Sequence, residues 1–253
     1  NLGPAKKGGE ELMQWMVKTV QEVVDLPLYL DTTNAKAIEA GLKVYVNKKG
    51  KAVVNSVMCR PERMEAQIPG VSEHDAGMVA LLWGPEGLPR DAAERGVLAT
   101  EILQKAVESG IAGEDIWVDP IITPVNVQQN QLLECNQFMS ELDMIAEVLA
   151  PGCRSTCGLS NVSNGAPDHL RPILNQTYMI MLEKFGMKSC IVDAFDKQLN
   201  EVAHGKWPDI AAVVNDVVDG KEIDMTALDE EAQKYVKTAR VLLGHSLYSD
   251  SWL

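Results

Sequence analysis

Six apolar, β-branched runs divide the chain at regular intervals, and each of them ends in or next to polar residues. The runs end near residues 31, 55, 83, 119, 161 and 193, so successive ends are 24, 28, 36, 42 and 32 residues apart. Amphipathic segments fill most of these intervals. The spacing is typical of βα units, and strands this apolar are expected in a parallel sheet that helices cover.

The number of units favours a closed barrel. The stretch "NLGP" precedes a strong helical pattern, "EELMQWMVKTVQEVV", so Asn1 is predicted as the last residue of a further strand. That unit and one before it bring the total to eight, the number in a (β/α)8 barrel. A six-stranded doubly wound sheet is the alternative, but no Gly-x-Gly-x-x-Gly turn follows any run. We therefore predict one barrel domain over residues 1–253, with a charged insertion at about 217–235.

Charge and cysteine content narrow the classes of function. The net charge is −13, from 36 acidic and 23 basic residues, and such a field repels the phosphates of nucleic acid. No apolar run reaches the roughly 18–20 residues of a membrane helix, so no membrane partner is expected. The chain has five cysteines, an odd number, and we expect them to be reduced thiols in a cytoplasm. The four histidines include no close pair, and no metal site is predicted.

The strand ends carry carboxylates and amides rather than lysines or metal ligands. Asp31, Asn55, Asp119 and Asn161 each follow an apolar run, and ligands of α/β folds bind outside the carboxyl ends of strands. Carboxylates accept hydrogen bonds, while amides donate and accept them, which suits a flat heterocycle with N–H and amino donors on one edge. The alternative is that each residue caps a helix. For all four together, a binding site is the better interpretation.

Four motifs resemble one known family. They read "LDTTNAKAIEAGLK", "VVNS", "DIWVDPIITPVNV" and "GLSNVSNG…RPILNQTY". In this order they resemble the pterin-binding methyltransferases that act between methyltetrahydrofolate and a corrinoid protein. The resemblance extends over nearly the whole chain. It implies an α/β TIM barrel whose first strand, first helix and most of whose second strand precede residue 1, so that "NLGP" ends the second strand.

The resemblance also implies which residues bind the pterin. The matching positions are Asn1, Asp31, Asn55, Asp119, Gly158, Ser160, Asn161 and Arg171. Asn161 matches the asparagine that reaches the methyl-bearing nitrogen of the pterin, and we predict Asn161 and Asp31 as the catalytic residues. Gly158 and Ser160 would shape the floor under the ring, and Asn1 would lie beside the pocket.

Cofactor, partner and oligomeric state follow from the same resemblance. Tetrahydrofolate would be the substrate. The chain has no Asp-x-His-x-x-Gly corrinoid motif, so a partner corrinoid protein would present the cobalamin. A homodimer is implied as well.

Three alternatives stay open. A dihydropteroate synthase would need a lysine-rich strand end and a pyrophosphate site, and Lys188 lacks the Ser-Arg companions expected there. A pterin-binding or corrinoid-docking subunit without catalysis would bind folate but not turn it over. A barrel whose polar strand ends are merely helix caps would bind no folate.

Overall fold

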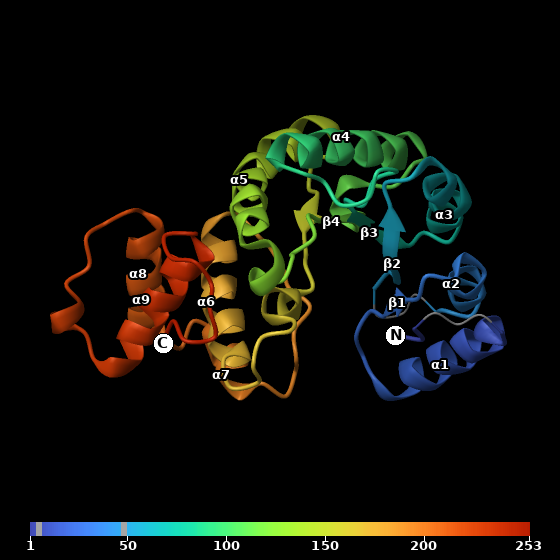
Figure 1. Cartoon of the computed structure of the whole chain (residues 1–253). Coiled ribbons are helices and arrows are strands. Elements are labelled where there is room, and N and C mark those ends of the chain that lie inside the picture. Colours follow the sequence, from blue (N-terminus) through green and yellow to red (C-terminus); the bar gives the residue numbers. More distant parts are fainter. Residues whose placement is uncertain (4–6, 47–49) are drawn as a thin grey trace. The chain divides into compact units, whose positions relative to one another are not determined.

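The computed structural model describes residues 1–3, 7–46 and 50–253 of the chain (Figure 1). Its contacts divide into two compact units that interleave along the sequence, and each unit is described by itself. Unit one comprises Asn1–Pro89, Glu94–Asp119 and Met144–Ser155. Unit two comprises Arg90–Ala93, Pro120–Asp143 and Thr156–Leu253.

Helices and strands alternate through the first two thirds of the chain, and helices dominate the rest. The first elements are α1 (Gly9–Val23), β1 (Tyr29–Asp31), α2 (Ala35–Leu42), β2 (Val53–Met58), α3 (Pro61–Glu73), β3 (Gly77–Leu81), α4 (Ala92–Glu108), η1 (Gly113–Asp115), β4 (Ile116–Asp119), α5 (Val125–Leu149) and β5 (Arg154–Ser155). The remaining ones are η2 (Leu159–Ser163), α6 (Arg171–Lys184), α7 (Lys197–Ala203), α8 (Pro208–Val218), η3 (Met225–Ala227) and α9 (Glu230–Leu242).

The sheet belongs to unit one, and its strands follow their order in the sequence. All pairs are parallel, in the order β1-β2-β3-β4-β5. A doubly wound sheet reverses its strand order at a switch point, whereas a barrel keeps the order of the chain. The observed order therefore confirms the barrel class over the doubly wound alternative. Within the described residues the five strands form an open sheet.

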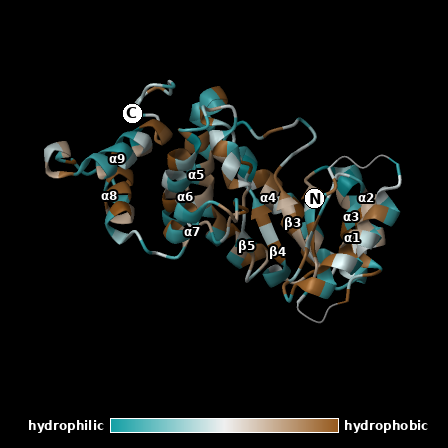
Figure 2. Cartoon of the chain, turned by 90° about the horizontal axis from the view of Figure 1, so that it is seen from below, coloured by the Kyte–Doolittle hydropathy of each residue, from teal (hydrophilic) through white to brown (hydrophobic). Residues whose placement is uncertain are grey.

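The central strands are buried on both faces, which is why they are continuously apolar. Met78, Val79 and Ala80 of β3 are fully buried, although successive side chains of a strand point to opposite faces. Figure 2 shows hydrophobic residues along β3 and β4. Burial on both faces is typical of parallel sheets in α/β proteins.

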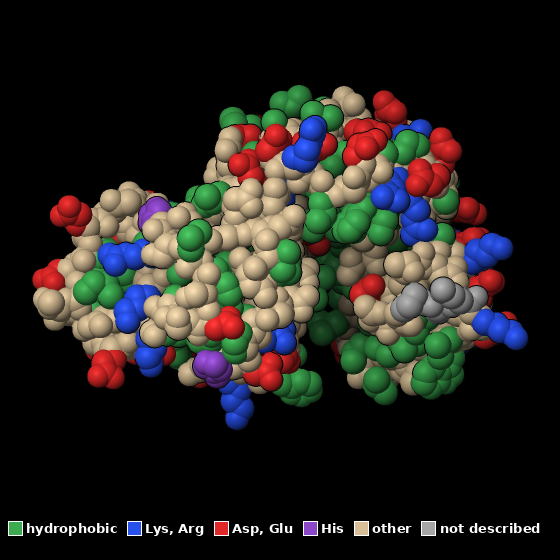
Figure 3. All heavy atoms as spheres, viewed as in Figure 1, with side chains coloured by type: hydrophobic (Ala, Val, Ile, Leu, Met, Phe, Trp, Pro, Cys, Tyr) green, Lys and Arg blue, Asp and Glu red, His purple; other side chains and the backbone are tan. Residues whose placement is uncertain are grey.

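Helix α1 packs on α2 through one small residue. A Cβ atom at Gly41 would lie 2.7 Å from Cγ of Met13, so a larger residue there would force the Met13 side chain to shift. The opposite side of α1 exposes Trp15 to 60%, and Figure 3 shows hydrophobic side chains over this helix. Among the described helices, none combines the length and the apolar character needed to cross a membrane.

Several predicted elements differ from the structure for local reasons. Residues 61–68 read in the sequence only as a short charged stretch, but they begin α3. Pro61 starts this helix, and Met64, Gln67, Ile68 and Val71 bury one of its faces. The third strand ends at Leu81 and not at residue 83, because the chain turns where the N–H of Trp83 bonds to the carbonyl of Leu81. The helical pattern at residues 34–48 predicts a helix over that whole range, but α2 ends at Leu42, and residues 47 and 48 lie outside the described residues.

The last two predicted strands are largely absent from the described structure. The run ending near residue 161 forms a strand only at Arg154–Ser155, and the run ending near 193 contributes one parallel bridge between Gly158 and Ile191. The segment at 217–235, predicted as a charged insertion, comprises the end of α8, η3 and the start of α9. Its status as an insertion stays a prediction.

Candidate functional site

Asp31 and Asn55 lie side by side at the carboxyl ends of β1 and β2. The two residues are partners in the parallel register, and neighbouring strands are about 4.8 Å apart. Both side chains are half-buried. A carboxylate and an amide are thus placed next to each other at one edge of the sheet.

Asn1 approaches Asp31 along the outer side of β1. The N–H of Leu2 donates to the carbonyl of Asp31 at 3.0 Å, so the N-terminal residues run beside the strand. The Asn1 Nδ2 atom donates to the Asp31 carboxylate at 2.7 Å, and the hydroxyl of Thr32 donates to the carbonyl of Gly3 at 2.8 Å. Asn1 is predicted as the last residue of a strand, but residues 1–3 lie beside β1 and form no strand, and Pro4 lies outside the described residues. One carboxylate oxygen of Asp31 is thereby oriented.

A bulge interrupts the register of β2 at Asn55. Val54 pairs with Met78 and Val57 pairs with Ala80, so β2 carries one residue more than β3 between these pairs. Asn55 and Ser56 occupy the bulge, and the peptide bond between them is cis. Bulges of this kind redirect a side chain and are frequent next to active sites.

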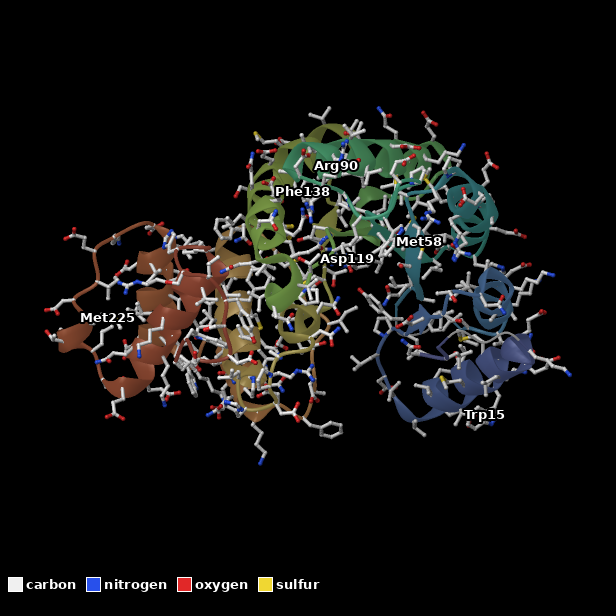
Figure 4. All side chains as sticks on the ribbon, in the orientation of Figure 1. Trp15, Met58, Arg90, Asp119, Phe138 and Met225 are labelled. Atoms are coloured by element: carbon white, nitrogen blue, oxygen red, sulfur yellow. The ribbon has the colours of Figure 1, made fainter. Side chains whose placement is uncertain are left out.

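Asp119 ends β4 on the same edge of the sheet. It is the register partner of Leu81, which in turn pairs with Met58, so Asp119 lies at the level of Met58, three residues past Asn55 on β2. Figure 4 labels Asp119 and Met58 at these strand ends. The Asp119 side chain is half-buried.

These residues do not serve as helix caps. Asn34 caps α2, its Oδ1 accepting the N–H groups of Lys36 and Ala37 at 3.1 and 3.3 Å. Arg60 occupies the capping position of α3, and α5 begins only at Val125. The cap interpretation therefore fails for the three polar residues that end β1, β2 and β4.

In unit two, Asn161 lies in a 3-10 turn and not at a strand end as predicted. The strand stops earlier because η2 begins after Gly158, and the N–H of Asn161 bonds to the Gly158 carbonyl at 3.2 Å. Ser160 and Asn161 are exposed. A Cβ atom at Gly158 would lie 3.2 Å from Nδ2 of Asn161, so this glycine leaves room for the amide.

Arg171 supports this turn through a residue that the sequence reasoning missed. Its Nε donates to the hydroxyl of Ser163 at 3.3 Å, and this hydroxyl donates to the carbonyl of Ser160 at 3.2 Å. Ser163 is fully buried. The second serine of "SNVS" could have indicated it, because a serine two residues after a candidate asparagine can bond back to the turn.

The predicted residues thus form two groups. Asn1, Asp31, Asn55 and Asp119 lie at the carboxyl edge of the sheet in unit one. Gly158, Ser160, Asn161 and Arg171 lie in and after η2 in unit two. The first group offers carboxylates and amides to donors of a flat ring, and the second offers an exposed amide on a supported turn.

Comparison with known proteins identifies the family. The model of the family described as pterin binding enzyme matches residues 6–193, well over half of the chain. The chain belongs to this family. The matched range contains every predicted site residue except Asn1, and the resemblance inferred from the four motifs is confirmed.

Curated relatives include enzymes of methyl transfer. The chain is 27% identical over 191 residues to the methylcorrinoid:tetrahydrofolate methyltransferase of Eubacterium limosum, covering 75% of this chain and 67% of that protein. It is 26% identical over 196 residues to the methionine synthase of Mycobacterium leprae, covering 74% of this chain. The match spans only 16% of that synthase, so one segment of the longer protein is related.

Solved structures support the fold. Dihydropteroate synthase from Thermus thermophilus superposes with a TM-score of 0.58 at 18% identity, covering 82% of this chain and 81% of that chain. The Xanthomonas albilineans enzyme gives the same TM-score and identity over 83% and 74% of the two chains. At this identity the likeness concerns the fold alone, and it confirms the α/β class of the pterin-binding barrels.

Proposed function

We propose that the chain is a methyltransferase that moves a methyl group between methyltetrahydrofolate and the cobalt of a corrinoid protein. The observation that carries the proposal is the similarity to the Eubacterium limosum methyltransferase over 191 residues. The polar strand ends of unit one support it independently, because they suit the donors of a pterin ring. The same site serves both directions of transfer, since forward and reverse reactions share one transition state.

The pterin binds at the strand ends of unit one in this proposal. Its amino and N–H groups donate to the carboxylates of Asp31 and Asp119, and the Asn55 amide can donate to the ring carbonyl or accept from an N–H. A hydrogen bond to a charged group contributes about 1.5–3 kcal/mol. Asn1 contributes by orienting the Asp31 carboxylate, to which its Nδ2 atom donates a hydrogen bond of 2.7 Å.

Catalysis requires activation of the methyl-bearing nitrogen. A tertiary amine leaves poorly until its nitrogen gains positive character, so protonation or strong hydrogen bonding is the main demand. Asparagine has no acidic proton to give, and we assign to Asn161 the acceptance of a hydrogen bond from the protonated nitrogen. We assign the Asp31 carboxylate to the hydrogen-bonded network through which the proton reaches this nitrogen. Gly158, Ser160 and Arg171 hold the η2 turn from which the Asn161 amide projects.

The second substrate comes from a partner. A corrinoid protein presents its cobalt for in-line displacement at the methyl carbon, and accurate placement of the two reactants supplies much of the rate. The proposal includes a homodimer, as the family resemblance implies.

A direct assay tests the function. Purified protein is mixed with methyltetrahydrofolate and Co(I) cobalamin, and the cobalt absorbance is followed for the appearance of methylcobalamin. We expect methyl transfer, and its loss in Asn161→Ala by about 10²-fold or more, as for removal of one preorganised hydrogen-bonding group. Gln137→Ala, which removes an exposed amide of α5, is the control. A normal single-turnover rate in Asn161→Ala would contradict the assigned role.

Assays on the same purified protein distinguish two alternative functions. The dihydropteroate synthase fold makes that activity the second candidate, and release of pyrophosphate in the presence of 4-aminobenzoic acid and a pterin pyrophosphate would establish it. Lys188, the lysine nearest to the last predicted strand, is exposed and binds Asp143 at 3.2 Å. Calorimetric binding of methyltetrahydrofolate, without turnover on free cobalamin or on a corrinoid protein, would instead indicate a non-catalytic subunit.

A further inference from the structure

Two cysteines of unit two lie directly opposite each other on neighbouring parallel segments. The N–H of Ile191 donates to the carbonyl of Cys157 at 2.7 Å, and Gly158 bridges Ile191 in parallel register. Because parallel partners advance together along both segments, Cys157 is the partner of Cys190. The two Sγ atoms are 3.6 Å apart.

We propose that Cys157 and Cys190 form a reversible disulfide that peroxide generates. Neighbouring strands are about 4.8 Å apart, within the roughly 4.4–6.8 Å between Cα atoms that a disulfide requires. To form the bond, the two sulfur atoms must approach from 3.6 Å to about 2.05 Å, the length of a disulfide. Both thiols are reduced in the structure.

The oxidant can reach one of the two sulfurs. Cys157 is buried, whereas Cys190 is half-exposed and lines a cavity of about 240 Å³ together with Met179, Met187 and Val192. A water molecule needs only about 10–15 Å³ of such volume, and hydrogen peroxide is little larger. Lys188 and Glu183 are the charged residues that line the same cavity.

The reaction balances with hydrogen peroxide as the oxidant. The Cys190 thiolate attacks one peroxide oxygen, the O–O bond breaks, and a proton completes the water that leaves, so that a sulfenic acid remains. The Cys157 sulfur then attacks the sulfenic sulfur, the S–O bond breaks, and the Cys157 proton leaves with the hydroxide as a second water. Two electrons pass from the thiol pair to peroxide. A dithiol reductant reverses the reaction by exchange.

The other cysteines are poor competitors. Burial raises the pKa of the Cys59 thiol to about 12, so it stays protonated and unreactive at neutral pH. Cys135 is buried, and Cys153, in unit one, directs its thiol to the carbonyls of Ile116 and Arg154 at 3.4 Å. The pairing in register is therefore the feature that selects Cys157 and Cys190.

A peroxide experiment on the full chain tests the proposal. Reduced protein is treated with hydrogen peroxide, quenched in acid, unfolded, alkylated and digested, and the thiols are counted. We expect the count to fall from five to three, since one disulfide consumes two thiols, with a cross-linked peptide that joins residues 157 and 190. Dithiothreitol should restore all five.

Matched variants sharpen the result. Cys190→Ser should abolish the disulfide, whereas Cys153→Ser should form it as the natural chain does. Five remaining thiols, a disulfide that involves Cys153, or a sulfinic acid on Cys190 with Cys157 still reduced would each overturn the proposal. The peptide map of the unmutated chain decides the question even if a variant folds poorly.

Discussion

Several contacts constrain Asp31 at the end of β1. Asn1 holds one of its oxygens, the strand fixes its backbone, and Asn55 stands beside it in register. No helix takes its side chain as a cap, since Asn34 fulfils that role for α2. A carboxylate held in this way is ready to accept hydrogen bonds from a ligand without a large loss of side-chain entropy.

Asp31→Asn should weaken methyltetrahydrofolate binding by about fivefold. A hydrogen bond to a charged group exceeds one between neutral groups by about 1 kcal/mol, and about 1.4 kcal/mol corresponds to a tenfold change in Kd. Calorimetry measures the change. Glu73→Gln, which neutralises the exposed last residue of α3, is the matched control and should bind normally. Equal Kd values for Asp31→Asn and the natural chain would remove Asp31 from the site.

Gly158→Ala should slow methyl transfer while leaving the fold intact. The backbone of Gly158 has φ −78°, which alanine adopts without strain, but its Cβ would lie 3.2 Å from Nδ2 of Asn161. The amide must shift, and misplacement of a reacting group by 1 Å costs up to about 10²-fold in rate. Single-turnover kinetics and the melting temperature are the measurements.

Gly96→Ala is the control for this substitution. Its Cβ would make an ordinary contact of 3.8 Å with Ile145, so both the rate and the fold should be preserved. A full rate in Gly158→Ala would mean that the position of the Asn161 amide does not limit the reaction.

Among the elements, α6 and α9 are joined by a buried polar contact. The Tyr235 hydroxyl donates to Oε1 of Gln176 at 2.6 Å, and both side chains are buried. Burial, followed by the negative charges of Glu231 and Asp196, raises the pKa of Tyr235 above its ordinary 10.0. The neutral phenol is therefore the form that the fold stabilises.

Tyr235→Phe should lower the free energy of unfolding by about 1–3 kcal/mol, because the Gln176 oxygen is left buried without its donor. Denaturant titration measures this loss. Tyr45→Phe is the control, since the Tyr45 hydroxyl bonds to the carbonyl of Gly50 in an exposed position. Equal losses of unfolding free energy in Tyr235→Phe and Tyr45→Phe would contradict the idea that burial makes the Tyr235 hydrogen bond more important for stability.

The raised pKa of Tyr235 predicts that the stability of the fold depends on pH in the alkaline range. The folded protein keeps the Tyr235 proton above pH 10.0, where the unfolded chain loses it. The stability contributed by the neutral phenol is thus fully present below pH 10.0 and is lost as the pH rises toward the raised pKa. Tyr235→Phe should show a shallower decline of stability above pH 10.0, which unfolding curves at several pH values would measure.

How well the sequence predicts a helix or strand depends on whether local or long-range contacts form it. The amphipathic pattern predicts helices at about residues 91–109, 171–185, 210–218 and 229–243. Helices α4, α6, α8 and α9 begin and end within two residues of these positions, because a repeated apolar face marks them locally. The strand predicted to reach Asn161 shortens to Arg154–Ser155, because pairing with a neighbour far away in sequence decides where a strand stops.

At the scale of the whole molecule, negative charge dominates. The net charge is −13, and on the face seen in Figure 3 acidic side chains gather over α3 and α4, where Glu65, Glu101 and Glu108 line a shallow cavity. This charge favours solubility at neutral pH through mutual repulsion of the molecules.

Solubility should be lowest near pH 4.8, the isoelectric point of the sequence. Repulsion between molecules vanishes where the net charge is zero, so light scattering should peak there and fall on both sides. A peak displaced toward neutral pH would indicate that an exposed apolar surface, such as that around Trp15 on α1, controls association instead.

The sequence by itself determined the succession of the first βα units, the pterin-binding family and the polar ends of β1, β2 and β4, because local pattern and motif encode each of these. The tertiary structure alone decided that Asn1 reaches Asp31, that a bulge interrupts β2 at Asn55, and that Ser163 links Arg171 to the η2 turn. It also decided that Cys157 faces Cys190. Contacts between residues far apart in sequence depend on register and loop path, which no local periodicity encodes.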